Sequence, residues 1–340
     1  MIWAWLAFFG VIAAALAIDL FVAHRKAHVV GMKEALRWSV FWIVMAIGFC
    51  GLVYLGYEHH WMGLGKALDG ADNRLNDGRS AAIKFLTGYI VEKSLSVDNL
   101  FVIALLFGAL AIPEQYRHRI LFWGVIGAMA FRGAMIGAGA ALVGRYHWLL
   151  YVFGGLLVIT AIKLLLPGAA ISPAEGWPVR IARRWLPLSD RIDGPHFMTR
   201  IGGRWLFTPL ALALAAVEVT DVIFAVDSIP AIFAITTDPF LVFTSNIFAL
   251  LGLRSLYFVL AGFMAKLVYL KTSLAAVLLL IGGKMLAGRR LEELIGDGSE
   301  LWLLLAVALI LAAGVAASLI ARRVNRLNWT SGGAAELRAP

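Results

Sequence analysis

Acidic residues recur at one spacing in two segments that are otherwise apolar enough to cross a membrane. Each copy of this motif contains an acid, five further residues, an aspartate and then a small amide or hydroxyl side chain: Glu92, Asp98 and Asn99 in the first copy, and Asp221, Asp227 and Ser228 in the second. A charge at the centre of a bilayer costs about 2.5–3.5 kcal/mol even on lenient insertion scales. Because the same costly pattern of acids occurs twice, we predict that these acids have a function.

Helix geometry limits how these acids could bind an ion. Two residues six positions apart on a straight helix are separated by about 9 Å along the axis and by about 120° around it. The two acids of one copy therefore cannot hold one ion from an unbroken helix. We expect Asp98 and Asp227 to come together from the two copies, with Glu92 and Asp221 at another depth. Glu218 lies one turn before Asp221 and shares its face.

Neutral oxygen atoms would complete such a metal site. Asn99, Ser228 and Asn246 offer side-chain oxygens, and Pro230 cannot donate to the carbonyl of Val226, which leaves that oxygen free. All seven histidines fall in loops or at the ends of apolar segments. Carboxylate and carbonyl oxygens suit Mn²⁺, Mg²⁺ or Ca²⁺, and they argue against zinc or copper.

Basic residues in the same segments could neutralise the acids when no ion is bound. Because cations repel cations, we interpret five of them as counter-charges and not as ligands: Lys93, Arg132, Lys163, Arg254 and Lys284. A salt-bridge network without an ion is the structural alternative, since charges within membranes pair with one another. Asp19, near the inner end of the first apolar segment, would line a cytoplasmic vestibule or pair with Arg25.

The composition predicts what kind of elements position these residues. Of the 340 residues, 61% are hydrophobic and 15% are charged, whereas a soluble domain has about 25% charged residues. The apolar segments are about 20 residues long, the length that crosses a hydrocarbon core about 30 Å thick. They do not alternate in polarity as barrel strands do. We therefore predict an all-α polytopic membrane protein.

Nine transmembrane spans are predicted, over residues 2–22, 38–57, 84–110, 120–143, 147–166, 206–235, 240–262, 270–287 and 301–320. The loops rich in Lys and Arg all fall on one side, which predicts an extracytoplasmic amino terminus and a cytoplasmic carboxyl terminus in a bacterial inner membrane. The net charge of +9 is thus interpreted as a sign of orientation and not of nucleic-acid binding. The one cysteine, Cys50, cannot form an intrachain disulfide.

The spans around the acidic motifs are predicted to form two repeats of three helices, spans 3–5 and spans 6–8. Arg132 and Arg254 lie on the second span of each copy, and Lys163 and Lys284 lie on the third. Because three is an odd number, the second copy must be inverted in the membrane, as in many transporters. In chain order the predicted parts are two N-terminal spans with an extracytoplasmic loop (1–83), the first repeat (84–166), a cytoplasmic linker (167–205), the second repeat (206–287), and a last span with a cytoplasmic tail (288–340).

Longer motifs add a family resemblance over roughly residues 15–290. They read EKSLSVDN at 92–99, EVTD at 218–221 with VDSIPA at 226–231, and SNIFALLGLRSLY at 245–257. The chain thereby resembles the TerC family of integral membrane proteins, also called the Alx or tellurium-resistance TerC family and related to the LysE-like exporters. The resemblance implies export of Mn²⁺ from the cytoplasm across the lipid bilayer, without an organic cofactor. It also implies a metal path formed by Glu92, Asp98, Asp221 and Asp227.

Three other functions remain open on the sequence. The acids could serve an exporter of another cation or of a small solute such as a basic amino acid, or the protein could accompany tellurite resistance without transport. For tellurite the sequence offers no chemistry, because one buried thiol cannot reduce an oxyanion. An intramembrane aspartyl protease would need a Gly-Xaa-Gly-Asp signature, whereas Thr220-Asp221 and Val226-Asp227 stand at the corresponding places. We therefore predict a transporter and not an enzyme.

Overall fold

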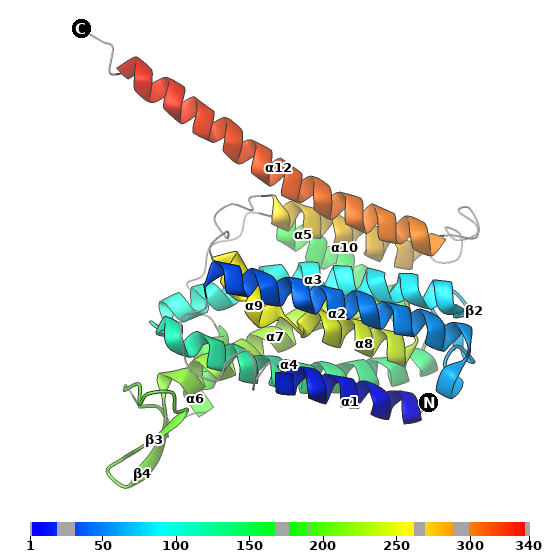
Figure 1. Ribbon diagram of the computed structural model, residues 1–340, viewed down its shortest axis with the longest axis horizontal. Coiled ribbons are helices and arrows are strands. Elements are labelled where there is room, and N and C mark those ends of the chain that lie inside the picture. The colour runs from blue at the N-terminus through cyan, green and yellow to red at the C-terminus, as the bar shows by residue number, and fades with distance from the viewer. Residues whose placement is uncertain are drawn as a thin grey trace.

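The computed structural model describes most of the chain, over residues 2–18, 31–166, 177–185, 187–189, 191–261, 269–287 and 299–336. Ten of its helices make up the main body: α1 (Ile2–Ile18), α2 (Met32–Glu58), α3 (Gly78–Ala109), α4 (Glu114–Arg145), α5 (Leu149–Leu165), α7 (Pro209–Phe233), α8 (Pro239–Leu250), α9 (Leu253–Ala261), α10 (Leu270–Ala287) and α12 (Ser299–Glu336). They run roughly along one direction, with α12 lying beside α10 at one edge of the bundle and diverging from it towards its carboxyl end (Figure 1).

A helix occupies each of the nine predicted spans, with shifted ends. Among the described residues, five helices are long and apolar enough to cross a membrane: α2, α4, α7, α10 and the Ser299–Ala321 part of α12. The bent pair α8–α9 forms a sixth candidate, and α1 and α5 are shorter apolar helices. The protein is therefore a multi-pass helical membrane protein, and nine spans is a finer prediction than helix length and composition establish.

The predicted seventh span, 240–262, is two helices and not one. α8 and α9 meet at an angle of 43°, and Gly252 between them has a φ of +77°. A Cβ at Gly252 would lie 2.7 Å from the ring of Trp42 on α2. Glycine adopts this left-handed backbone conformation more readily than any other residue type. It also leaves room for Trp42, which packs directly on the break.

Short elements occupy two loops that were predicted without secondary structure. The loop between α2 and α3 holds a 3₁₀ turn (Trp61–Gly63) and the two-residue strands β1 (Leu68–Asp69) and β2 (Arg74–Leu75), which pair antiparallel. The predicted linker holds α6 (Trp177–Trp185) and the antiparallel hairpin of β3 (Met198–Ile201) and β4 (Arg204–Phe207). α3 begins at Gly78, before the predicted start of its span, because Asp77 caps the helix by accepting from the Ser80 backbone N–H.

The helices of the two predicted repeats pack crosswise. α3 packs on α8, α4 packs on α7, and α5 packs on α10. Glycines permit close approach, as small residues do between membrane helices. At the α5–α10 contact a Cβ at Gly282 would lie 2.9 Å from the Gly154 carbonyl oxygen. At the α3–α8 contact a Cβ at Gly88 would lie 2.8 Å from the Ser245 hydroxyl.

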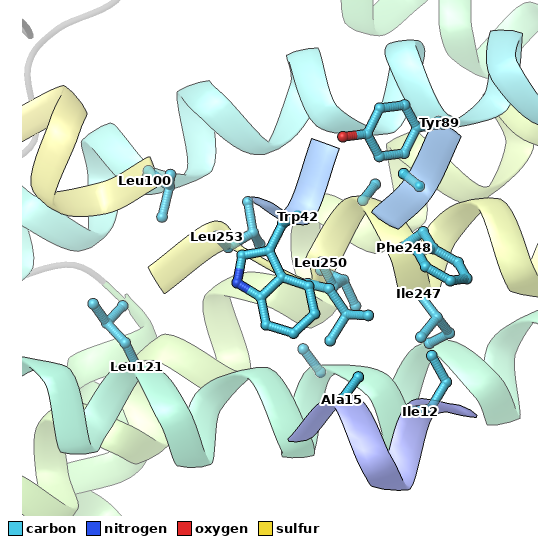
Figure 2. Packing of buried hydrophobic residues seen from close by; sticks show 14 of the residues in the cluster. Ile12, Ala15, Trp42, Tyr89, Leu100, Leu121, Ile247, Phe248, Leu250 and Leu253 are labelled. Atoms are coloured by element: carbon cyan, nitrogen blue, oxygen red, sulfur yellow. The ribbon is translucent and has the colours of Figure 1, made fainter. Parts of the chain in front are cut away.

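Aromatic side chains fill the centre of the bundle. Trp42 of α2 is buried among Leu250 of α8 and Leu253 of α9, between α3 and α4 (Figure 2). Phe49 of α2 stacks on Phe248 of α8 with their ring centres 4.5 Å apart. This apolar packing fixes α3, α4 and α8 around the buried charges described next.

Candidate metal site

One arginine joins the first acids of the two motifs. Arg132 comes from α4, and its guanidinium donates through Nη1 to Glu92 Oε1 of α3. Its Nη2 and Nε donate to the two carboxylate oxygens of Asp221 on α7, at 3.0 and 3.2 Å. Nη1 also donates to Asn246 Oδ1 of α8 at 3.1 Å and to Ser228 Oγ of α7 at 3.3 Å. Four helices thus meet at one guanidinium, and we call these five residues the Arg132 cluster.

The Arg132 cluster is closed to solvent on the α3 side. The side chains of Arg132 and Glu92 are 0% exposed, and that of Asp221 is 13% exposed. The planar guanidinium suits this geometry, since it forms a two-bond fork with a carboxylate. Desolvation of these charges is compensated only while all partners stay in place, so loss of one partner leaves an uncompensated buried charge.

The carboxylates around the Arg132 cluster outnumber the arginine. Glu218 on α7 interacts electrostatically with Asp221, one turn away. Its carboxylate lies against α4 where Gly127 leaves space, because a Cβ at Gly127 would clash with Glu218 Oε1. Within the described part of the chain, Glu92 Oε2 and Glu218 Oε2 are buried without a hydrogen-bond partner. Because three acids face one guanidinium and two of their oxygens accept no hydrogen bond, the cluster could still bind a cation.

The second acids of the motifs have separate partners. Asp227 on α7 accepts from Thr160 Oγ1 of α5 at 2.9 Å and interacts electrostatically with Lys163. Asp98 on α3 interacts electrostatically with Lys271, at the start of α10. Among the residues that the structure describes, no three His, Cys, Asp or Glu side chains are arranged to hold a metal ion. In this conformation the predicted ligands are therefore distributed over distinct charge clusters.

The other predicted residues lie at several places. Asn99 is buried on α3, and Asp19 lies outside the described residues. Lys93 donates to the backbone carbonyls of Ala249 and Leu251, at 3.0 and 3.1 Å, and so caps the carboxyl end of α8.

Arg254 and Lys284 are not members of the Arg132 cluster. Arg254 is buried on α9, 5.8 Å from the centre of the Phe122 ring. Lys284, near the end of α10, lines a cavity of about 820 Å³ together with Asp72 and His147. The predicted counter-charge role therefore has direct contacts for Arg132 and electrostatic interactions for Lys93 with Glu92 and for Lys163 with Asp227.

A further charge cluster, not predicted from the sequence, lies at the amino-terminal end of α3. Lys84 forms ion pairs with Asp69 at 2.9 Å, Asp72 at 2.6 Å and Glu300 of α12 at 3.3 Å. The only signal in the sequence was a lysine at the edge of an apolar segment after an acidic loop. With a rise of 1.5 Å per residue, Lys84 and Glu92 are about 12 Å apart along α3, and Asp98 follows about 9 Å further on. Charged side chains thus recur along the length of α3.

Asp69 ties the α2–α3 loop to the turn between α7 and α8. Its carboxylate accepts from the Thr236 hydroxyl and from the Thr237 backbone N–H and hydroxyl, at 2.7 and 2.9 Å for the latter two. Burial by itself would raise the pKa of Asp69, but the Lys84 ammonium and these hydrogen bonds lower it to about 2. At neutral pH the loop is therefore bound to the α7–α8 turn by an ionised carboxylate.

These features define a multi-pass helical membrane protein with charged side chains buried between its helices. The model of the integral membrane protein TerC family matches residues 77–326. The chain belongs to this family, as its motifs predicted.

Named relatives support the same assignment. An uncharacterized membrane protein of Myxococcus xanthus is 50% identical over 282 residues, covering 83% of this chain and 82% of its own. The putative membrane-bound redox modulator Alx of Escherichia coli K12 is 43% identical over 288 residues, covering 83% and 85%. An uncharacterized membrane protein of Rickettsia felis is 35% identical over 321 residues, covering 94% and 98%. No solved structure matches the chain.

Proposed function

We propose that this protein exports a divalent metal ion, with Mn²⁺ as the substrate, from the cytoplasm through the buried acids of its two motifs. The observation that carries the proposal is the Arg132 cluster, where acids from both motifs meet at one buried cation. Buried intramembrane acids mark ion pathways in transporters. Their oxygen chemistry favours a hard cation such as Mn²⁺.

Arg132 acts in this proposal as a counter-cation that stands in for the ion. When no metal is bound, its guanidinium neutralises Glu92 and Asp221. When Mn²⁺ arrives, the free oxygens of Glu92 and Glu218 are its first ligands, and Asn246 and Ser228 supply neutral oxygens. The guanidinium then moves aside, because it and Mn²⁺ are both positively charged and repel one another at close range. Asp98 and Asp227 hold the ion on its way to or from the Arg132 cluster.

Crosswise packing supports the two inverted repeats that this transport mechanism uses. The first helix of each repeat packs on the second helix of the other, and the third helices pack on one another. A pseudo-two-fold axis between the repeats would produce this reciprocal pattern. Lys163 near the end of α5 and Lys284 near the end of α10 would then face opposite sides of the membrane. The loops rich in Lys and Arg support an orientation with the amino terminus outside and the linker in the cytoplasm of a bacterial inner membrane.

The name of the relative Alx, a putative membrane-bound redox modulator, raises a second function. A thiol-based redox role would need a reactive cysteine pair, whereas this chain has Cys50 as its one cysteine. Its thiol is buried and lies 3.6 Å from the Ala82 carbonyl oxygen. The buried acids therefore favour ion transport over thiol chemistry in this protein.

Cellular metal content tests the proposal. Cells that lack manganese export would be grown in excess Mn²⁺ with the wild type, Asp98→Asn, Asp227→Asn or the control Glu114→Gln, which alters an exposed acid on α4. Mn and Mg would be measured by mass spectrometry, with membrane insertion checked by immunoblot. We expect the wild type and the control to lower cellular Mn severalfold and leave Mg unchanged, and the two aspartate variants to lose this effect. Low Mn in both inserted aspartate variants would contradict the proposal.

A further inference from the structure

A small basic module lies at one end of the helix bundle, where α6 packs on α7 (Figure 1). It comprises α6, the β3–β4 hairpin and the described residues between them, and we call it the arginine module (residues 177–207). Backbone bonds hold it together, from Phe207 N–H to the Pro187 carbonyl at 2.8 Å and from Thr208 N–H to the Phe197 carbonyl at 3.0 Å. The Arg119 guanidinium of α4 lies 5.3 Å from the centre of the Phe197 ring. The module is thus attached to the bundle and held at a set position.

The arginine module carries a concentrated positive charge. Its sequence contains six arginines and two aspartates, with no lysine or glutamate. All six arginines are exposed: Arg180, Arg183, Arg184, Arg191, Arg200 and Arg204. Of the two aspartates, Asp193 accepts a hydrogen bond from the Thr199 hydroxyl at 2.9 Å. The surface therefore presents guanidinium groups to a negatively charged partner.

The β3–β4 hairpin has one face that exposes apolar side chains, which we call the open face, and another face that is covered at Thr199. Side chains of a strand alternate between its two faces, and directly paired residues share a face. Arg200 pairs with Trp205, and Met198 pairs with Phe207, so these four residues share one face. On this face Met198 is 43% exposed and Trp205 is 60% exposed. The opposite face includes the buried Thr199, which is covered by the preceding loop.

The hairpin lies where the bundle would meet the membrane surface. β4 ends at Phe207, and α7, one of the candidate spans, begins at Pro209. At about 3.3 Å per residue, Trp205 is at most about 13 Å from the start of that helix. The hairpin projects sideways from the end of the bundle and not along the helices (Figure 1). The hairpin as a whole therefore lies at the level of the lipid headgroups on that side of the membrane.

We propose that the arginine module binds the anionic phospholipid headgroups of the leaflet on its side of the membrane. Arginine forms two-bond forks with phosphate groups, and an arginine near an anionic membrane surface contributes about 1 kcal/mol to binding. Trp205 sits in the interface, where tryptophan is enriched, and Met198 enters the acyl boundary. The mixture of exposed arginines with exposed apolar side chains favours a lipid surface over a purely ionic partner. The module would hold the amino-terminal end of α7 at the membrane surface.

Two residues of equal exposure provide the test. Met198 on the open face and Ile201 on the opposite face are each 43% exposed. The full-length chain, in a Cys50→Ala background, would carry a nitroxide label at Met198→Cys or at Ile201→Cys. A label at Leu75→Cys, on the other hairpin, serves as the insertion control. Each protein would be reconstituted into phosphatidylcholine vesicles with or without 30% phosphatidylglycerol, and the contact of the label with oxygen and with a water-soluble nickel complex would be measured.

Phosphatidylglycerol is expected to move the label at 198 out of reach of nickel and into contact with oxygen, while the labels at 201 and 75 stay accessible to nickel. Arg200→Gln should lower the ratio of docked to undocked label about fivefold, since it removes one arginine. Equal nickel access at 198 in both lipid mixtures would overturn the proposal. So would protection by added RNA without protection by phosphatidylglycerol, because the surface would then serve a soluble polyanion. The readout needs no transport, so its outcome is independent of the proposed metal export.

Discussion

Replacement of Arg132 by glutamine should destabilise the protein through the carboxylates that it leaves behind. Five hydrogen bonds converge on the guanidinium, and two of its partners are carboxylates. Breaking a buried ion pair by removal of one partner costs about 3–5 kcal/mol. We expect Arg132→Gln to lower the free energy of unfolding by this amount. The matched control Arg145→Gln, an exposed arginine on the same helix, should change it by less than about 0.5 kcal/mol.

A double-mutant cycle separates this explanation from a simple packing defect. Glu92→Gln together with Arg132→Gln removes both charges, so the double variant should lose less stability than the sum of the single losses by about 1–3 kcal/mol. The assay is unfolding of the full-length protein in detergent by a titration with dodecyl sulfate, followed by tryptophan fluorescence. Additive losses would refute the reasoning, because they would show that the two charges do not depend on one another.

Metal should affect the same variant in a characteristic way. If Arg132 stands in for the ion, Arg132→Gln leaves the acids of the Arg132 cluster without their cation. Added Mn²⁺ should then raise the unfolding midpoint of Arg132→Gln more than that of the wild type. An equal shift in both proteins would mean that the guanidinium and Mn²⁺ do not compete for these acids.

Three further predictions follow from individual contacts. Asp69→Asn should lower the melting temperature at pH 6 by the equivalent of about 2–3 kcal/mol, because the folded pKa of Asp69 is about 2 against an ordinary 3.8. This difference from the wild type is full above pH 4 and should vanish as the pH falls through 2; a constant difference would contradict it. Gly127→Ala should destabilise the protein by about 1–3 kcal/mol through its clash with Glu218, whereas Gly137→Ala, with nothing within 4 Å, should be neutral or stabilising in the same unfolding assay. Gly252→Ala should lower stability by about 1–3 kcal/mol, because its φ is +77°; an unchanged unfolding midpoint would show that the α8–α9 break tolerates a side chain.

Much of the fold could be predicted because a long apolar segment in a helical membrane protein predicts a helix. Each predicted span received a helix, since a chain in lipid must satisfy its backbone hydrogen bonds within helices or barrels. The break at Gly252 could not be predicted in this way, because it depends on Trp42, a residue 210 positions away in the sequence. The helix and hairpin of the arginine module could not be predicted, because residues 167–205 contain several prolines and no long periodic segment and were predicted only as a cytoplasmic linker.

The sequence identified the candidate residues of the site, but it predicted less well which of them lie together. The repeated motif identified Glu92, Asp98, Asp221 and Asp227, and helix geometry placed Glu92 and Asp221 at one depth, where Arg132 now joins them. For the other two acids, Lys163 was a predicted counter-charge and interacts electrostatically with Asp227, but their remaining partners could not be foreseen. Thr160 and Lys271 reach Asp227 and Asp98 across helices whose packing the sequence does not specify. The Lys84 cluster was missed for the same reason, since Asp69, Asp72 and Glu300 come from two separate segments.

Flux of Mn²⁺ into or out of sealed vesicles tests the central claim most directly. The purified wild type and a Glu92→Gln/Asp221→Asn variant, which removes the acids of both motifs at the Arg132 cluster, would be reconstituted at equal density. Movement of Mn²⁺ would be followed with an entrapped fluorescent indicator. We predict a Mn²⁺ flux for the wild type that is at least tenfold above that of the folded variant and of empty vesicles. A wild-type flux no greater than that of empty vesicles, or an equal flux in the variant, would contradict the account.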